Sequence, residues 1–342
     1  MGRDSTIYDI AREAGVSIAT VSRVLRGEGS VAPKTRQKVE EIISAHSYRP
    51  SAFARGMTTK KTNFLGIILP KILNPNYAMH FSGAADAARE HGYTMSLFPW
   101  KSIISSGNSG ALLRSERRLD GAIICVEYLP PEIEDRFTES LEELQAGMPV
   151  VLIGCVPARF DYPSITYNMA EITRRAVEYL IGLGHEKIAL IGGVEEDRDD
   201  FRRDIGYRQG LEEARLPYVD SYRIYCGGMA EDGTAAMGRM LDSLQRPYWP
   251  TAVIALNDMV AMGCMESARR YGLKLPEDLS VIGCDNLFCA PYLSPALTSF
   301  DTYQAEVGRK AVEMLLSGEK HRESARWELI ERASCTEVKR TV

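Results

Sequence analysis

The sequence of 342 residues lacks long hydrophobic runs. Nowhere do apolar residues approach the roughly 18 uninterrupted positions that a membrane-spanning helix needs. The N-terminal residues also lack the apolar segment of a secretory signal peptide. These absences argue against membrane insertion and secretion, and we expect a cytoplasmic protein.

Cysteine and histidine are too scattered to indicate a disulfide framework or a metal site. The seven cysteines are odd in number, no two are spaced as C-x-x-C, and the five histidines lack metal-ligand spacing. Most of the cysteines lie in apolar runs, which is typical of buried, reduced thiols. We therefore expect no metal and no cofactor. The cysteines are Cys125, Cys155, Cys226, Cys264, Cys284, Cys289 and Cys335.

The short motifs of common α/β enzymes are also missing. The sequence contains no G-x-S-x-G, no G-x-x-x-x-G-K-[ST] and no H-E-x-x-H, and no G-x-G-x-x-G follows a predicted strand. Many hydrolases and dehydrogenases share an α/β sheet with acidic residues at the strand ends, so an enzyme is one alternative. Because its signatures are absent, we predict that the protein is not an enzyme.

Charge is distributed unevenly along the chain. The net charge is −5, but the first 61 residues contain eleven Lys or Arg against six Asp or Glu. This segment therefore has a net charge of +5, and the remainder has a net charge of −10. The N-terminal end suits contact with phosphates, whereas the rest of the chain repels them.

The N-terminal segment has the pattern of two short helices joined by a turn. The string Thr6-Ile7-Tyr8-Asp9 resembles a capping box, and the spacing of the apolar residues predicts a helix over Thr6–Glu13. Gly15 permits the tight turn that follows. Ser17 is a good N-cap for a second helix over Ile18–Leu25.

The second helix presents a face suited to reading DNA bases. Arg23 can form two hydrogen bonds with guanine, and Ile18 and Ala19 can contact thymine methyl groups. The alternative is an ordinary helical hairpin on which Arg23 is merely solvated. A third helix is expected to open at Pro33, which completes a unit of the size of a DNA-binding domain. The candidate DNA-binding residues of this helix-turn-helix are Thr6, Ser17, Ile18, Ala19, Thr20, Ser22 and Arg23.

Two strings resemble the LacI/GalR family of bacterial repressors: T-I-Y-D-I-A-R-E-A-G-V-S-I-A-T-V-S-R-V-L at residues 6–25, and Y-R-P-S-A-F-A-R-G-M at residues 48–57. The resemblance implies that the second string is a hinge helix which folds on operator DNA. Met57 would insert into the minor groove where the family usually has leucine, with Ala54 and Arg55 beside it. The alternative for Met57 is an ordinary linker residue.

From residue 63 onward, short apolar runs alternate with amphipathic stretches, the pattern of parallel strands joined by helices. Two sets of strands predict an α/β region with two lobes. The expected strands are Phe64–Leu69, Thr94–Phe98, Gly121–Val126 and Pro149–Ile153, then Lys187–Ile191, Tyr222–Tyr225, Thr251–Leu256 and Ser280–Cys284. The expected helices include Tyr77–Glu90, Ile172–Leu183 and Asp258–Tyr271.

The family resemblance extends through this region, in blocks such as Y-L-I-G-L-G-H-E-K-I-A-L-I-G-G and L-P-E-D-L-S-V-I-G-C-D-N. It implies a sensor like the periplasmic sugar-binding proteins, with two parallel Rossmann-like sheets and an effector between the lobes. We expect the chain to cross between lobes near Pro163, Cys289 and Arg322. A transport-type binding protein is the second alternative, but it would lack the basic helical N-terminus. The expected divisions are a DNA-binding domain at 1–48, a hinge at 49–62 and a sensor at 63–340, with one lobe formed by 63–162 and 289–321 and the other by 163–288 and 322–340.

Ligands of parallel sheets bind beyond the carboxyl ends of the strands, so the loops that follow these runs are the candidate effector site. By resemblance, Arg203, Asn257–Asp258 and Asp285 occupy positions that hydrogen-bond the effector. Acids, amides and an arginine suit hydroxyl-rich rings, and aromatic side chains can cover apolar sugar faces. The candidate effector-binding residues are Asn76, Tyr77, Trp100, Asp197, Asp199, Arg203, Asn257, Asp258 and Asp285.

Each candidate also has a purely structural interpretation. Asp258 and Asp285 can cap the helix or turn that they precede, and the two aromatic residues can be packing residues. Arg203 can pair with the acidic run at 195–200. This run and Tyr167, which stands where the family usually has Asp, depart from the family pattern and leave the identity of the effector open.

A single helix-turn-helix reads only half of a DNA site, so a homodimer on a pseudo-palindromic, double-stranded operator is expected. An effector, here a sugar or sugar derivative, would change the closure of the lobes and thereby the population of protein competent to bind DNA. The sequence leaves open whether the effector releases or recruits DNA.

Overall fold

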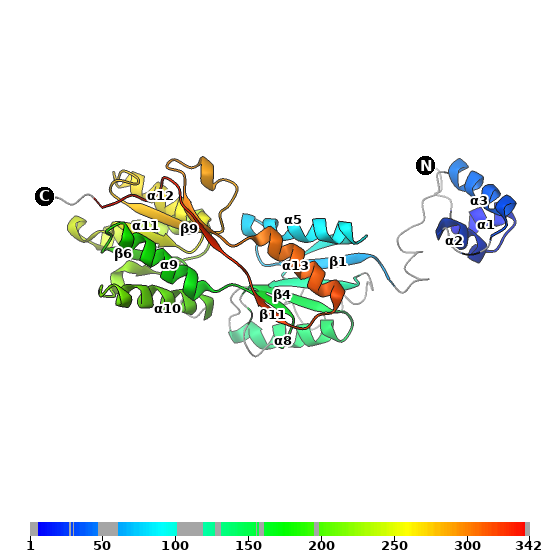
Figure 1. Cartoon of the computed structure of the whole chain (residues 1–342), viewed down its shortest axis with the longest axis horizontal. Coiled ribbons are helices and arrows are strands. Elements are labelled where there is room, and N and C mark those ends of the chain that lie inside the picture. Colours follow the sequence, from blue (N-terminus) through cyan, green and yellow to red (C-terminus); the bar gives the residue numbers. More distant parts are fainter. Residues whose placement is uncertain are drawn as a thin grey trace. The chain divides into compact units, whose positions relative to one another are not determined.

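The computed structural model describes residues 6–26, 29, 31–46, 61–100, 119–126, 131–154, 156, 161–194 and 198–338, with only the backbone at 26, 131–133 and 198–201. The chain divides into two compact units, Met1–Asn63 and Phe64–Val342. Figure 1 shows helices in the described part of the first unit and two sheets flanked by helices in the second. The predicted helical N-terminal region and α/β sensor are thus confirmed.

The described residues of the first unit form three helices, α1 (Ile7–Ala14), α2 (Ile18–Arg26) and α3 (Pro33–Ala45). They enclose a small core in which Ile10, Val21 and Val39 are completely buried. Apolar residues at helical spacing on each helix meet in this core, which gives three otherwise marginal helices a common hydrophobic face to bury.

The ends of α1 follow from local chemistry. Thr6 is its N-cap, and the backbone N–H of Thr6 donates to Asp9 Oδ2 at 3.0 Å while the Asp9 N–H donates to Thr6 Oγ1 at 3.4 Å. Gly15 ends the helix with φ +70°, a conformation that costs glycine little. The capping box and turn predicted from the sequence are both confirmed.

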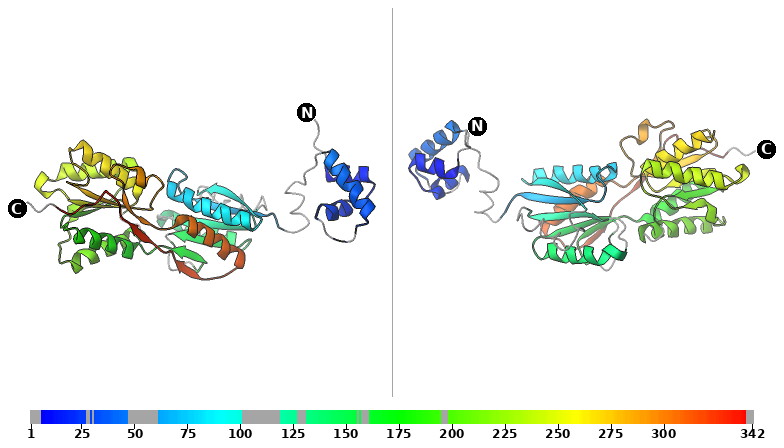
Figure 2. Two further views of the ribbon diagram at one scale, coloured as in Figure 1. Left: turned by 45° about the horizontal axis from the view of Figure 1, so that its top comes forward. Right: turned by 180° about the vertical axis from the view of Figure 1, so that it is seen from behind.

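The second unit begins with a six-stranded sheet in the order β11-β5-β4-β3-β1-β2, in which every neighbouring pair is parallel. Helices α5 (Pro75–Glu90) and α13 (Gln304–Ser317) cover one face, and α8 (Pro131–Gln145) covers the other (Figures 1 and 2). We call this assembly the N-lobe. Its strands are β1 (Phe64–Leu69), β2 (Thr94–Pro99), β3 (Gly121–Val126), β4 (Val150–Gly154), β5 (Ser164–Thr166) and β11 (Arg322–Ser324).

The other sheet has the order β12-β10-β9-β8-β6-β7, and only the β10–β12 pair is antiparallel. Helices α11 (Ala230–Ser243) and α12 (Asp258–Arg270) pack on one face, and α9 (Met169–Gly182) and α10 (Arg198–Glu213) pack on the other. We call this assembly the C-lobe. Its strands are β6 (Ile188–Ile191), β7 (Arg223–Ile224), β8 (Ala252–Ala255), β9 (Ser280–Cys284), β10 (Thr298–Asp301) and β12 (Glu328–Ile330), and the short 3-10 helices are η1 (Asp220–Tyr222), η2 (Arg246–Tyr248) and η3 (Ala290–Tyr292).

Glycines bring α11 and α12 into backbone contact. A Cβ added at Gly263 would lie 1.9 Å from Ala230 O, and one added at Gly233 would lie 2.3 Å from Val260 O. Each helix therefore supplies the glycine that the other helix needs for its close approach. This packing fixes the position of α12, whose first residues belong to the candidate effector site.

The chain crosses between the lobes later than the sequence suggested. The crossing expected near Cys289 is corrected, because β10 still belongs to the C-lobe sheet, whereas those expected near Pro163 and Arg322 move by only a few residues, because β5 and β11 pair in the N-lobe sheet. The crossings instead follow Thr166, follow Asp301 and lie between Ser324 and Glu328. Strands of three or four residues carry too little periodicity to be recognised without their pairing partners.

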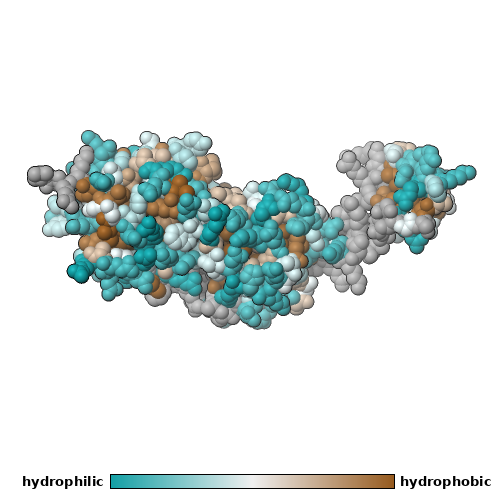
Figure 3. All heavy atoms as spheres, viewed as in Figure 1, coloured by the Kyte–Doolittle hydropathy of each residue, from teal (hydrophilic) through white to brown (hydrophobic). Residues whose placement is uncertain are grey.

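No helix among the described residues is long and apolar enough to cross a membrane. The face of the molecule seen in Figure 3 is mainly hydrophilic, with hydrophobic areas in small patches.

Candidate functional sites

The outer face of α2 is available to a ligand. Ile18, Ala19 and Arg23 are exposed, whereas Thr20 and Ser22 are half-buried. Ile18 keeps 39% of its surface in contact with solvent. An apolar residue beside an arginine on a projecting helix is the arrangement expected of a base-reading surface.

The N-terminal end of α2 is held by the side chain of Ser17, which the sequence predicts as the N-cap of this helix. Ser17 Oγ accepts a hydrogen bond from the Thr20 N–H at 3.2 Å and lies 2.9 Å from Thr20 Oγ1. Ser17 therefore orients the exposed face as well as belonging to it. Tyr8 on α1 is also exposed, with 65% of its surface in contact with solvent.

Several predicted residues cannot be placed. The hinge residues Ala54, Arg55 and Met57 lie outside the described residues, as does Asp197 in the sensor. Asp199 lies in the first turn of α10, where only the backbone is described.

At the carboxyl edge of the C-lobe sheet, Asn257 is the N-cap of α12. Its Oδ1 accepts from the Val260 N–H at 2.8 Å, and its Nδ2 donates to Gly228 O at 3.1 Å. The structural interpretation of the sequence assigned the cap to Asp258 instead, and this is corrected. Asn257 ties the loop before α11 to the start of α12.

Asp258 accepts hydrogen bonds from two other segments of the C-lobe. Its side chain is completely buried, with Oδ2 accepting from the Leu287 N–H at 2.7 Å and Oδ1 accepting from Ser299 Oγ at 2.5 Å. Burial raises the pKa of this carboxyl to about 7, against the lowering effect of the two hydrogen bonds. With both oxygens engaged inside the protein, Asp258 holds the loop that carries Asp285.

Asp285 follows β9 and has a strained backbone, with φ +111°. Its N–H donates to Phe300 O at 2.8 Å, yet its Oδ2 is buried without a hydrogen-bond partner. Burial and then the charge of Asp258 raise the pKa of Asp285 well above its ordinary value, and Arg203 opposes this effect. The structure thus brings together Arg203, Asp258 and Asp285, three residues predicted from distant parts of the sequence.

The N-lobe contributes the first turn of α5. The Asn76 side-chain oxygen Oδ1 is buried without a hydrogen-bond partner, and Tyr77 is half-buried against the sheet. His80 Nδ1 lies 2.9 Å from Asn76 O and can only donate to it, so His80 Nε2 accepts from the Tyr167 hydroxyl at 2.7 Å. Burial lowers the pKa of His80 to about 4, which keeps it neutral. Sequence reasoning missed His80, although a histidine four residues after Asn76 on one helix face was a usable signal.

Trp100 has a different role from the one expected. It is 7% exposed, its ring stacks on Phe137 of α8 with centroids 5.4 Å apart, and its Nε1 donates to Cys125 O at 2.9 Å. A tryptophan enclosed by the sheet and α8 is a core residue, as the structural alternative held, so the expectation that Trp100 covers a sugar is corrected.

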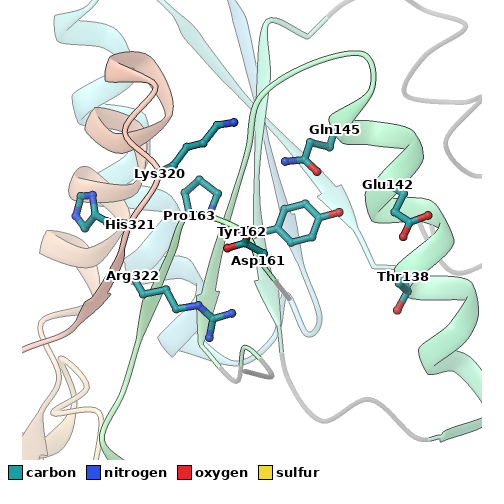
Figure 4. Close-up of a pocket in the computed structure, with 9 residues that line it drawn as sticks. All are labelled: Thr138, Glu142, Gln145, Asp161, Tyr162, Pro163, Lys320, His321 and Arg322. Atoms are coloured by element: carbon teal, nitrogen blue, oxygen red, sulfur yellow. The ribbon is translucent and has the colours of Figure 1, made fainter. Parts of the chain in front are cut away.

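A pocket of about 710 Å³ opens between α8 and the loops that precede β5 and β11 (Figure 4). None of the predicted effector residues lines it, because it lies where these strands begin rather than where they end. Its walls carry both charges, with Lys320 and Arg322 supplying positive groups and Glu142 and Asp161 negative ones. The pocket is therefore separate from the site predicted at the carboxyl edges.

Comparison with known proteins agrees with this arrangement. Residues 6–51 match the model of the lacI family of bacterial regulatory proteins, and residues 177–335 match a periplasmic binding protein-like domain. Catabolite control protein A of Priestia megaterium is 34% identical over 318 residues, covering 91% of both chains. The Lac repressor dimer bound to operator and the anti-inducer ONPF has the same fold, with a TM-score of 0.84, 24% identity and coverage of 98% of this chain and all of that one. The complex of the regulator CelR with cellobiose has a TM-score of 0.69 at 27% identity, covering 96% of this chain and 99% of that one.

A helix-turn-helix unit joined to a two-lobed α/β unit of this kind defines a DNA-binding transcriptional regulator and not an enzyme. The chain belongs to the lacI family of bacterial regulatory proteins.

Proposed function

We propose that this regulator is a cytoplasmic repressor that binds a pseudo-palindromic operator as a homodimer and responds to a sugar or sugar derivative. The observation that carries the DNA-binding part is the exposed face of α2, where Ile18, Ala19 and Arg23 project from a helix fixed by Ser17. Arg23 would form two hydrogen bonds to a guanine, and the two apolar residues would contact thymine methyl groups.

Dimerisation follows from the size of this face, because one helix reads a few base pairs and a symmetric pair doubles the contacts. The operator complex of the similar Lac repressor contains a dimer, which supports the same assembly here. We assign residues 49–62 to a hinge that joins the two units, with Met57 acting as the minor-groove wedge beside Ala54 and Arg55.

Base reading by Arg23 is tested by Arg23→Ala in the full chain. The affinity for a selected operator should fall by about 1–3 kcal/mol, while binding to unrelated DNA stays nearly unchanged. Arg12→Ala is the matched control, because this arginine is 79% exposed on α1 and its loss removes the same charge. The control should weaken both kinds of DNA to a similar, small extent. If Arg23→Ala also weakened both equally, Arg23 would be a phosphate contact only.

For the effector we propose a site formed by Asn76 and Tyr77 of the N-lobe with Arg203 and Asp285 of the C-lobe. The unpartnered oxygens of Asn76 and Asp285 support it, because buried acceptors of this kind can accept hydrogen bonds from sugar hydroxyls. The cellobiose complex of CelR supports a carbohydrate ligand. The predicted Asp197 and Asp199 belong to the same proposal, whereas Asn257 and Asp258 would act by holding the surrounding loops.

A thermal-shift screen of the full chain against sugars, sugar phosphates and nucleobases tests this site. A ligand present at 100 times its dissociation constant stabilises the folded protein by about 2.7 kcal/mol. Asp285→Asn should reduce the shift caused by a sugar that stabilises the wild type. A shift that survives in Asp285→Asn would place the ligand elsewhere, and the pocket between α8 and β11 would be the next site to examine.

A further inference from the structure

The second and third crossings between the lobes meet the C-lobe sheet side by side. Asp301, the last residue of β10, pairs with Glu328, the first residue of β12, and their antiparallel ladder ends there. Beyond this pair, one segment runs on to α13 and the other comes from β11, and both elements belong to the N-lobe (Figure 1). Contacts between side chains can therefore decide how firmly the two crossings hold together at the boundary of the lobes.

Tyr303 in the second crossing is the centre of such a set of contacts. Its hydroxyl donates to Glu328 Oε2 at 2.6 Å, and the guanidinium of Arg326 lies over its ring, 3.5 Å from the ring centroid. Arg326 belongs to the third crossing, and its Nε donates to Glu306 Oε2 of α13 at 2.9 Å. These four side chains form a continuous bridge from β12 of the C-lobe to α13 of the N-lobe. We call this bridge the clasp.

The backbone of Tyr303 is strained. Its φ of +51° and ψ of +46° lie in the left-handed region, which costs free energy for a residue with a Cβ. The Tyr303 N–H donates to Asp301 Oδ1 at 2.7 Å, so this hydrogen bond and the clasp together compensate for the cost. Strained conformations persist only where the surrounding contacts hold them, and they cluster at residues that switch between two states. Tyr303 is also the N-cap of α13, and the residues that absorb a domain movement commonly lie at the ends of helices or strands.

We propose that Tyr303 is a switch residue that sets the closure of the two lobes. In the clasped state its backbone is held in the left-handed region. In the released state the clasp is broken and the backbone relaxes to an ordinary conformation. A change of φ from +51° to about −60° redirects the chain at the start of α13, so the lobes take a different relative orientation. Tyr303 is thus a positioning residue, which acts on the effector site through the arrangement of the lobes.

Hydrogen bonds join the switch residue to the loop of Asp285. Asp301, which holds the Tyr303 N–H with Oδ1, accepts from Asn286 Nδ2 with Oδ2 at 3.0 Å. Gln304, the residue after Tyr303, donates from Nε2 to the main-chain oxygen of Asp285 at 2.8 Å. A ligand that displaces Asp285 therefore acts on groups on both sides of the switch residue and biases its two states. This coupling rests on the proposed effector site, whereas the two states of Tyr303 do not depend on any ligand.

Hydrogen–deuterium exchange of the full chain without added ligand tests the switch, because amide exchange rates report states that are populated only rarely. Two amides are informative, and fragmentation mass spectrometry can resolve them. The Val307 N–H donates to Tyr303 O at 2.9 Å, a bond that is lost when the backbone of Tyr303 changes conformation. The Ala325 N–H donates to Thr166 O at 2.7 Å and joins the third crossing to the first. Exchange at Val307 therefore reports the switch itself, and exchange at Ala325 reports the movement of the crossings.

Tyr303→Phe keeps the ring and removes the hydrogen bond to Glu328. The released population should rise about fivefold, the equivalent of about 1 kcal/mol for one net hydrogen bond. The exchange rates of Val307 and Ala325 should both rise by this factor, because one opening event exposes both amides.

Glu328→Ala removes the same hydrogen bond from its other end, at an exposed position where folding is not at risk. It should raise both exchange rates as much as Tyr303→Phe does. The double variant should raise them no further, because the same bond is lost in all three proteins.

Tyr248→Phe is the matched control, because Tyr248 is 62% exposed on η2, at the opposite edge of the C-lobe sheet, and its loss should leave both rates unchanged. The proposal is overturned if Tyr303→Phe and Glu328→Ala exchange both amides at the wild-type rates. It is also overturned if only Val307 responds, because α13 would then fray without moving the crossings. If the rates behave as expected but no sugar stabilises the chain, the carbohydrate effector is wrong and the switch residue stands.

Discussion

Replacing Asp258 by Asn should change how the stability of the protein depends on pH. The carboxyl is completely buried at the start of α12, where it accepts hydrogen bonds from Leu287 and Ser299. Its pKa rises from 3.8 to about 7, because the loss of hydration opposes ionisation more strongly than the two hydrogen bonds favour it.

The direction of the effect follows from the two pKa values. The carboxyl ionises near 3.8 in the unfolded chain and near 7 in the folded one, so its protonated form favours folding. The stabilising contribution is complete below the unfolded value and is lost as the pH rises through 7. A difference of this size corresponds to about 4 kcal/mol. Asparagine has no charge to desolvate, and it can accept from Leu287 and donate to the Ser299 hydroxyl.

The measurement is the free energy of unfolding by urea for the wild type and Asp258→Asn, at several values between about pH 4 and pH 8. The variant should gain on the wild type as the pH rises, by up to about 4 kcal/mol, with most of the change between about pH 4 and pH 7. The comparison cancels the titration of groups distant from Asp258, His80 and His185 included, whereas Asp285, whose pKa the charge of Asp258 raises, contributes to the difference. A difference between the two proteins that stays constant with pH would refute the argument, because Asp258 would then ionise alike in both states.

Three further substitutions test other parts of the structure. Gly263→Ala should destabilise the sensor by about 1–3 kcal/mol or more, because its Cβ would meet Ala230 O, whereas Gly238→Ala on α11, with its nearest neighbour at 3.6 Å, should be neutral or stabilising in urea unfolding. Thr6→Ala should destabilise the N-terminal unit by about 1 kcal/mol through loss of the capping box, seen as earlier melting of its helices by circular dichroism. Met57→Gly should reduce operator bending in a ring-closure assay, and unchanged bending would count against the wedge.

The sequence was sufficient to predict those structural features that depend only on residues close together in the chain. The capping box at Thr6 and the left-handed turn at Gly15 use residues within one helical turn, so the sequence alone located α1 and the start of α2. The strands β1 and β3 were predicted with their observed bounds, because six consecutive apolar residues indicate a strand buried on both faces.

Residues whose roles depend on distant partners were assigned less well. Asn257 and Asp258 are adjacent, and the sequence did not distinguish the residue that caps α12 from the one that anchors Ser299, 41 positions away. Trp100 was predicted to face the ligand because it follows a strand. In the structure its ring instead stacks on Phe137.

The sequence by itself determined that this chain has a helical DNA-binding unit and a two-lobed α/β sensor, because periodicity, caps and turn residues act over a few positions. The tertiary structure decided where the chain crosses between the lobes and which acids are buried. It also decided that Gln304 meets Asp285. Such features depend on strand pairing and on the removal of water from groups that are far apart in sequence, and no local pattern records them.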